Sequence, residues 1–171
     1  MFQQGKSTMS VTLKVFVYGT LKTGEPNHHW LTKPENGHSK LVGEGMTLVK
    51  YPLVIASRYN IPFLLDVPGI GHNVSGEVYE IDEKMLSNLD ILEDYPSYYT
   101  RRLETIVMKA EGSIQEQCWT YFLNGHKPHL LELPTMASYS SLGDHGLQYM
   151  ERYRRDPAYD HRLEVIDRAL F

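Results

Sequence analysis

The sequence predicts an α+β domain in which short strands form a curved or barrel-like sheet with helices outside it. Seven short apolar runs are bounded by glycine, proline or asparagine, and only two segments show helical spacing of apolar residues. The chain has 171 residues, which suits one domain with its own hydrophobic core. No internal repeat or long linker divides it, so we expect a single α+β unit.

The predicted strands occupy most of the chain between residues 13 and 123. Each run is rich in aliphatic, β-branched or aromatic residues and ends near a turn residue. The seven predicted ranges are Leu13–Tyr18, Leu41–Leu48, Pro52–Ala56, Pro62–Val67, Val74–Ile81, Arg102–Met108 and Gln117–Leu123.

The most regular helical pattern lies in the segment IDEKMLSNLDILEDYP. Asp82 is a suitable N-cap residue, Glu83 favours the first turn, and Pro96 prevents a helix from continuing beyond Tyr95. The residues that share one apolar face are Met85, Leu86, Leu89 and Leu92. This spacing predicts a helix that packs on the sheet through that face.

A second helix is predicted near the C-terminus, where Asp156 and Pro157 suit the N-cap and the first helical position. The apolar stripe that follows consists of Tyr159, Leu163, Ile166 and Leu170. We therefore divide the chain into a disordered tail (1–10), the main domain (11–150) and an extension with an amphipathic helix (151–171). We expect this helix to dock on its own domain in a monomer, and a dimer formed through it is the alternative.

Composition and charge argue against several classes of partner. The formal net charge is −4 and the basic residues form no long run, so neither nucleic acid nor an anionic membrane is expected as a partner. Cys118 is the only cysteine, which suits a reducing compartment. No segment is apolar enough for a signal peptide or a membrane span. We expect a cytoplasmic protein.

The sequence lacks the common motifs of metal and covalent catalysis. Its eight histidines form no HExxH motif and no cluster with cysteine, so no metal site is expected. There is no GxSxG motif, and Cys118 lies in an apolar strand pattern, where a buried and inert thiol is expected.

Glu93 is the carboxylate that the helical pattern directs toward the core. At about 100° per residue, the four apolar residues cover an arc of roughly 120° that includes Glu93 and excludes Asp90 and Asp94. Burial and the negative end of the helix dipole would raise the pKa of Glu93 toward a value useful for a general base. An ion pair with Arg101 or Arg102 is the structural alternative, and the pattern leaves both open.

The first strand ends in Tyr18-Gly19-Thr20-Leu21. Gly19 would let backbone N–H groups turn toward a ligand, and Thr20 adds a hydroxyl, although an ordinary turn is the alternative. Together with Glu93, this loop would offer amide donors for an anion and one base. That combination suits an intramolecular reaction in which the substrate supplies its own nucleophile.

Four segments of the sequence resemble a known family. VFVYGTLKTGEPNHHWL, YPLVIASRYNIPFLLDVPGIG, GEVYEIDEKMLSNLDILEDYPSYYTRR and DHGLQY resemble, in this order, the γ-glutamylamine cyclotransferases of the γ-glutamylcyclotransferase-like (AIG2-like) family. The resemblance runs from about Val15 to Tyr149. It implies a compact mixed β-barrel with flanking helices and no cofactor.

The resemblance also implies site residues and an activity. It assigns substrate binding to the Tyr18–Leu21 loop and the general base to Glu93, with Tyr99 lining the pocket and Arg101 in a structural role. The implied reaction converts small γ-glutamylamines, such as γ-glutamyl-ε-lysine, to 5-oxoproline and a free amine. The alternatives are a cyclotransferase for γ-glutamyl dipeptides or glutathione, and a non-enzymatic protein that binds a small ligand.

Overall fold

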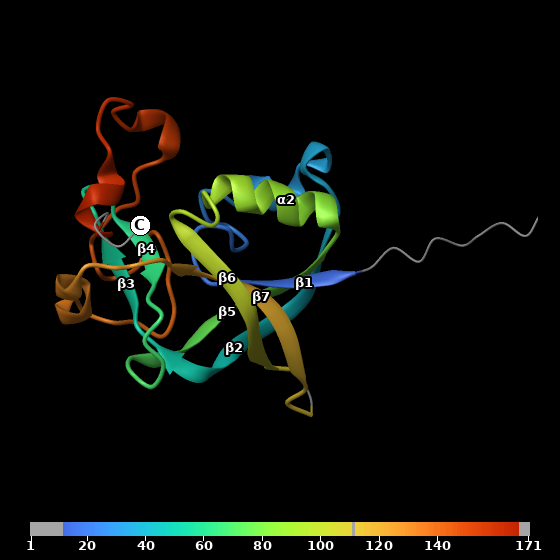
Figure 1. Cartoon of the computed structure of the whole chain (residues 1–171). Helices are drawn as coiled ribbons and strands as arrows, with labels where there is room; N and C mark the ends of the chain where they lie inside the picture. Colours follow the sequence, from blue (N-terminus) through green and yellow to red (C-terminus); the bar gives the residue numbers. More distant parts are fainter. Residues whose placement is uncertain (1–11, 111, 168–171) are drawn as a thin grey trace, which may run out of the picture.

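Five strands close into a barrel in the order β1-β5-β2-β6-β7, and β3 and β4 form a separate hairpin beside it (Figure 1). The computed structural model describes residues 12–110 and 112–167. The strands are β1 (Leu13–Val17), β2 (Ser39–Tyr51), β3 (Leu53–Ala56), β4 (Ile61–Leu64), β5 (His72–Ile81), β6 (Tyr99–Met108) and β7 (Gln115–Leu123). All seven predicted strands are confirmed, and only their ends differ.

Strand β1 closes the barrel and is buried on both faces. It pairs antiparallel with β5 along its whole length and parallel with β7 at Val15 and Trp119, which makes the barrel mixed. Val15 and Val17 belong to one core cluster, whereas Phe16 and Tyr18 belong to the other. This double burial explains why β1 is a nearly continuous apolar run instead of an alternating one.

The barrel is narrow enough to require glycine where β5 passes β1. A Cβ atom at Gly76 would lie 2.3 Å from the carbonyl oxygen of Val17 and 2.7 Å from the ring of Phe16. Any larger residue would force the two strands apart and displace the end of β1.

Helix α2 (Glu83–Leu92) lies across one side of the barrel, as Figure 1 shows. Its start is confirmed as predicted, because the Asp82 side chain accepts a hydrogen bond from the Met85 backbone N–H at 2.9 Å. The four residues of the predicted apolar face are all buried. The remaining helices of the described residues are short: α1 (His29–Thr32) and four 3₁₀ helices at Pro34–Asn36, Pro128–Glu132, Arg152–Arg154 and His161–Glu164.

A polar cluster fixes the end of α2 against the barrel. Asp90 receives hydrogen bonds from Arg101 of β6 at 2.8 and 3.1 Å and from the Tyr121 hydroxyl of β7 at 2.7 Å. Residue Asp94, just beyond the helix, has a φ of 49°, so the chain leaves the helix in a left-handed turn. The position of the last helical turn relative to β6 and β7 is thereby set.

The single amphipathic helix predicted after Asp156 is not formed by the described residues 156–167. The structure has a turn and one short 3₁₀ helix, His161–Glu164, in its place. The reason is competition for backbone hydrogen bonds: the Val165 carbonyl accepts from Lys127, and the Asp167 N–H donates to Gly125. These groups are therefore not available for helical bonding within the segment.

The C-terminal segment nevertheless packs on its own domain, beside the β3–β4 hairpin (Figure 1). The Met150 N–H donates to the Tyr59 carbonyl at 2.9 Å, and the Arg58 guanidinium carbon lies 3.4 Å from the centre of the Tyr159 ring. Ile166 of the predicted stripe is buried, whereas Leu163 is exposed. Aromatic and backbone contacts, rather than a helical stripe, hold the segment in place.

Two sequence-based expectations lie outside the described residues: the tail at 1–10 and Leu170, the last residue of the predicted stripe. In the ranges that the structure describes, every helix is too short or too polar to span a membrane.

The packing of α2 predicts a matched pair of stability effects. Leu89→Ala should lower the free energy of unfolding by about 2–5 kcal/mol, because Leu89 is completely buried. Ile91→Ala on the same helix should change it by no more than about 0.5 kcal/mol, because that side chain is 75% exposed. Urea unfolding followed by circular dichroism measures both, and equal losses would contradict the packing described here.

Candidate active site

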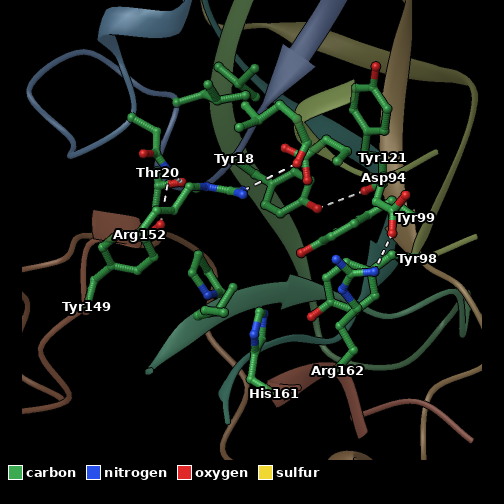
Figure 2. A pocket seen from close by; sticks show the side chains of 18 of the residues that line it. Tyr18, Thr20, Asp94, Tyr98, Tyr99, Tyr121, Tyr149, Arg152, His161 and Arg162 are labelled. Carbon is green, nitrogen blue, oxygen red and sulfur yellow. Dashed lines mark hydrogen bonds and ion pairs between the residues drawn. The ribbon is translucent and has the colours of Figure 1, made fainter. Parts of the chain in front are cut away.

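A pocket lies where the end of β1, the end of α2, the start of β6 and the C-terminal segment meet (Figure 2). Its cavity volume is about 100 Å³. The five residues singled out from the sequence all line this pocket: Tyr18, Gly19, Thr20, Leu21 and Glu93. Residues from two predicted features that are far apart in the chain therefore meet at one cavity.

The loop after β1 presents backbone donors to the pocket. Within the described ranges, no acceptor takes a hydrogen bond from the backbone N–H of Gly19, Thr20 or Leu21. The loop itself is held from behind, because the Thr20 carbonyl accepts from the Asn27 N–H at 2.8 Å and the Thr20 hydroxyl accepts from the Asn27 side chain at 2.9 Å. Fixed amide donors without an internal partner can receive an anion or a developing oxyanion.

The aromatic side chain of Tyr18 anchors this loop. The Tyr18 hydroxyl donates to the Tyr121 carbonyl at 2.8 Å, and Figure 2 shows this bond below the Tyr121 label. Burial raises the pKa of Tyr18 well above its ordinary value, so the phenol stays protonated. Tyr18 thus forms part of the pocket wall while its hydroxyl is occupied by the barrel.

Glu93 caps the C-terminal end of α2 and points into the pocket. Its backbone N–H still donates to Leu89 at 2.9 Å, which keeps the residue on the apolar face of the helix. Burial raises the pKa of the Glu93 carboxyl from its ordinary value of 4.5 to about 7, and the positive charge of Arg152 opposes this shift. At neutral pH the group exchanges readily between its charged and neutral forms, as a general base requires.

The ion pair that the sequence left open as the alternative for Glu93 is not formed. Arg101 pairs with Asp90, and Arg102 pairs with Asp66 and Glu104. None of the ion pairs found among the described residues includes Glu93. Arg101 therefore has the structural role that the family resemblance implied.

Aromatic side chains form the wall around the Glu93 carboxyl. Tyr98, Tyr99 and Tyr121 line the pocket together, as Figure 2 shows, which agrees with the expectation for Tyr99. The Tyr98 hydroxyl is buried and has no hydrogen-bond partner in the part of the chain that the structure describes. The burial that raises the pKa of Glu93 thus occurs in a pocket lined by these aromatic side chains.

Sequence reasoning missed the contribution of the C-terminal segment. Tyr149 holds the loop side of the pocket, since its hydroxyl accepts from the Asn27 side chain at 2.9 Å. Arg152, Arg155 and Arg162 also line the pocket. The sequence signal for this contribution is the group of arginines that follows Tyr149.

Other reactive side chains do not offer a competing centre. Burial raises the pKa of the Cys118 thiol to about 12, which confirms the expectation of an inert cysteine. Over residues 12–110 and 112–167, no three His, Cys, Asp or Glu side chains are arranged to hold a metal ion.

Known proteins match this chain over most of its length. The family model described as gamma-glutamyl cyclotransferase, AIG2-like, matches residues 15–141. A Drosophila melanogaster relative with a provisional gamma-glutamylcyclotransferase name is 54% identical over 77% of this chain and 82% of its own. The Mus musculus gamma-glutamylaminecyclotransferase is 46% identical over 82% of this chain and 98% of its own.

A solved structure agrees with these matches. The crystal structure of an AIG2-like protein from Mus musculus superposes with a TM-score of 0.81 at 44% sequence identity, and covers 84% of this chain and 99% of its own. The mixed barrel and the resemblance drawn from the sequence are both confirmed by these findings. The chain belongs to the gamma-glutamyl cyclotransferase, AIG2-like family.

Proposed function

We propose that this chain is a γ-glutamylamine cyclotransferase, which converts γ-glutamylamines to 5-oxoproline and a free amine. The observation that carries the proposal is the Glu93 carboxyl, with a pKa raised to about 7, in the same pocket as the backbone N–H groups of Gly19, Thr20 and Leu21, which have no hydrogen-bond partner among the described residues. The names of the mouse and zebrafish relatives, which are 46% and 45% identical, support the γ-glutamylamine class.

In the proposed reaction the substrate provides its own nucleophile. The α-amino nitrogen attacks the γ-carbonyl carbon, a five-membered ring closes, and the bond from that carbon to the departing amine breaks. Because both reacting groups belong to one molecule, their correct alignment supplies up to about 7–11 kcal/mol of the barrier in well-oriented cases.

Glu93 handles the proton in this scheme. The α-amine is an ammonium group in water, so it loses a proton to the Glu93 carboxylate before it attacks. Glu93 releases this proton to water, accepts a second proton from the attacking nitrogen when the new C–N bond forms, and passes that second proton to the departing amine, which restores the carboxylate. The free amine takes up one proton from water after its release. The N–H groups of the Tyr18–Leu21 loop stabilise the oxyanion that develops on the γ-carbonyl oxygen.

A γ-glutamylcyclotransferase acting on dipeptides or glutathione is the second candidate, and the name of the Drosophila melanogaster relative favours it. The assay that separates the two measures 5-oxoproline released from γ-glutamyl-ε-lysine, γ-glutamyl-alanine and glutathione. We expect turnover of γ-glutamyl-ε-lysine with the highest kcat/KM. A preference for either of the other substrates would overturn the γ-glutamylamine assignment, and no turnover of any would favour a binding protein.

Glu93→Gln should lower kcat by about 10²–10⁴-fold, because the amide keeps the shape of the side chain but cannot accept the ammonium proton. The measurement is steady-state release of 5-oxoproline. Glu83→Gln, on the exposed first turn of the same helix, is the matched control and should leave kcat unchanged. A loss of less than about tenfold in Glu93→Gln would reject Glu93 as the base.

The raised pKa of Glu93 predicts the pH dependence of the reaction. Only the carboxylate accepts a proton, so kcat/KM should fall about tenfold per pH unit below a midpoint near 7, the value to which burial raises the pKa. A midpoint near 4.5, the ordinary value, would show that the carboxyl is not desolvated in solution.

The same shift gives a stability control with a defined sign. The folded state prefers protonated Glu93, so the wild-type fold loses stability as the pH rises from about 4.5 to about 7. Glu93→Gln, which stays neutral, should therefore be more stable than the wild type at pH 8, and the difference should vanish below pH 4.5. Urea unfolding at the two pH values measures this.

Gly19→Ala should raise KM more than it lowers stability. A Cβ atom at this position would lie 3.0 Å from Cγ of Pro62, which lines the pocket, so the loop or the Pro62 ring must shift to make room. A shifted loop presents its N–H groups at the wrong place for the substrate. Unchanged kcat and KM would show that these N–H groups do not contact the substrate.

A further inference from the structure

The positive charges of the pocket come from the C-terminal segment, beyond the residues 15–141 that the family model matches. The cationic or ionisable nitrogen groups that line it, within the described chain, are Arg152, Arg155, His161 and Arg162. The carboxyl groups that line it are Glu93 and Asp94. The pairing of these groups shows which charges remain without a partner.

Two of the four groups are accounted for within the protein. Arg162 pairs with Asp94, which also lines the pocket, as Figure 2 shows. Burial and the nearby arginines Arg155 and Arg162 lower the pKa of His161 to about 4, so this side chain is neutral at pH 7. Arg152 and Arg155 remain, and neither pairs with a carboxylate among residues 12–110 and 112–167.

The guanidinium of Arg155 is held in place but lacks an anion. Its Nε–H donates to the Met150 carbonyl at 3.0 Å, and its central carbon lies 5.1 Å from the Tyr59 ring centre and 5.3 Å from that of Tyr149. Its Nη2 atom is buried and has no hydrogen-bond partner in the described residues. The Arg155 side chain is half-buried, and an anion that reaches Nη2 would give this buried donor the hydrogen-bond partner that it lacks among the described residues.

Arg152 lies beside the proposed base. Its guanidinium donates to the carbonyl of Leu92 at 3.4 Å, the residue directly before Glu93, and Figure 2 shows it reaching into the pocket. Its positive charge also lowers the pKa of Glu93 against the effect of burial. An anion near Glu93 would therefore meet the Arg152 charge as well.

We propose that Arg152 and Arg155 bind the α-carboxylate of the γ-glutamyl group and so position the α-amine at Glu93; this inference rests on the proposed function. The α-carbon of the substrate carries both the amine and the carboxylate, so contact of the amine with Glu93 brings two carboxylates close together. Guanidinium groups offset the repulsion between them. The N–H groups of the Tyr18–Leu21 loop are then left for the oxyanion.

The first test compares three arginines of the same segment. Arg152→Met and Arg155→Met should each raise KM about 10–100-fold with a small change in kcat, because a charge-assisted hydrogen bond to the bound substrate is lost. Arg154→Met is the matched control, because Arg154 is exposed and does not line the pocket. Unchanged KM in both pocket variants would overturn the inference.

Two pairs of substrates identify which carboxylate is bound. γ-Glutamyl-ε-lysine has a second carboxylate on its amine, whereas γ-glutamyl-butylamine has none, and both should lose the same factor in KM. An increase in KM confined to the lysine substrate would show that the arginines bind the second carboxylate, on the departing amine, and would overturn the inference. In the second pair, the α-carboxylate of the substrate is replaced by an α-carboxamide. The wild type should bind this analogue about 10–100-fold more weakly than the carboxylate, and the difference should be far smaller in the Arg152→Met and Arg155→Met variants.

A binding measurement separates recognition from a structural role. Calorimetry should show that the wild type binds 5-oxoproline, which keeps the carboxylate, more tightly than 2-pyrrolidinone, which lacks it. This preference should be reduced in Arg155→Met and partly restored in Arg155→Lys. A lower melting temperature with an unchanged preference would mean a purely structural role for Arg155. A wild type that forms no 5-oxoproline overturns both proposals, whereas an active wild type with unaffected arginine variants overturns only this one.

Discussion

The burial of β1 on both of its faces is the constraint on which the rest of the structure depends. Both edges of β1 are paired as well, antiparallel with β5 along its length and parallel with β7 at Val15, so the strand is held at both edges and on both faces. The Tyr18–Leu21 loop therefore starts from a rigid point, and the hydrogen bond from Tyr18 to Tyr121 holds its first residue. Backbone donors placed in this way need no reorganisation when they meet a developing charge.

Two acids follow each other at the end of α2, where the helix dipole disfavours negative charge. Asp94 is compensated by its ion pair with Arg162, but Glu93 has no such pair in the described structure and has a pKa near 7. The two acids lower the stability of the helix end, but four buried apolar residues and the Asp90–Arg101 pair hold α2 against the barrel. A carboxyl group that lowers the stability of the fold and lines a pocket is typical of a residue that is retained for function.

Local patterns were sufficient for the barrel strands, for α2 and for the direction of Glu93. The spacing of apolar residues within a short segment indicates whether one or both faces of a strand, or one face of a helix, are buried. This spacing can be read from neighbouring residues alone. The wheel position of Glu93 between Leu89 and Leu86 is information of this kind, and so is the apolar run that ends at Gly19. The C-terminal segment was mispredicted by the same method, since the helical spacing after Asp156 competes with backbone bonds to residues 125–127 that no local pattern reveals.

The sequence by itself thus determined the barrel strands and α2, and it singled out the Tyr18–Leu21 loop and Glu93 as the two candidate features of the site. Only the tertiary structure decided the partners: Arg101 to Asp90, Arg102 to Asp66 and Glu104, and Arg162 to Asp94. It also brought Arg152 and Arg155 into a pocket whose other walls come from β1 and α2, although the whole chain has a net charge of −4. Electrostatic interactions depend on distance in space and on burial, and neither quantity is fixed for residues that lie far apart in the chain until the chain has folded.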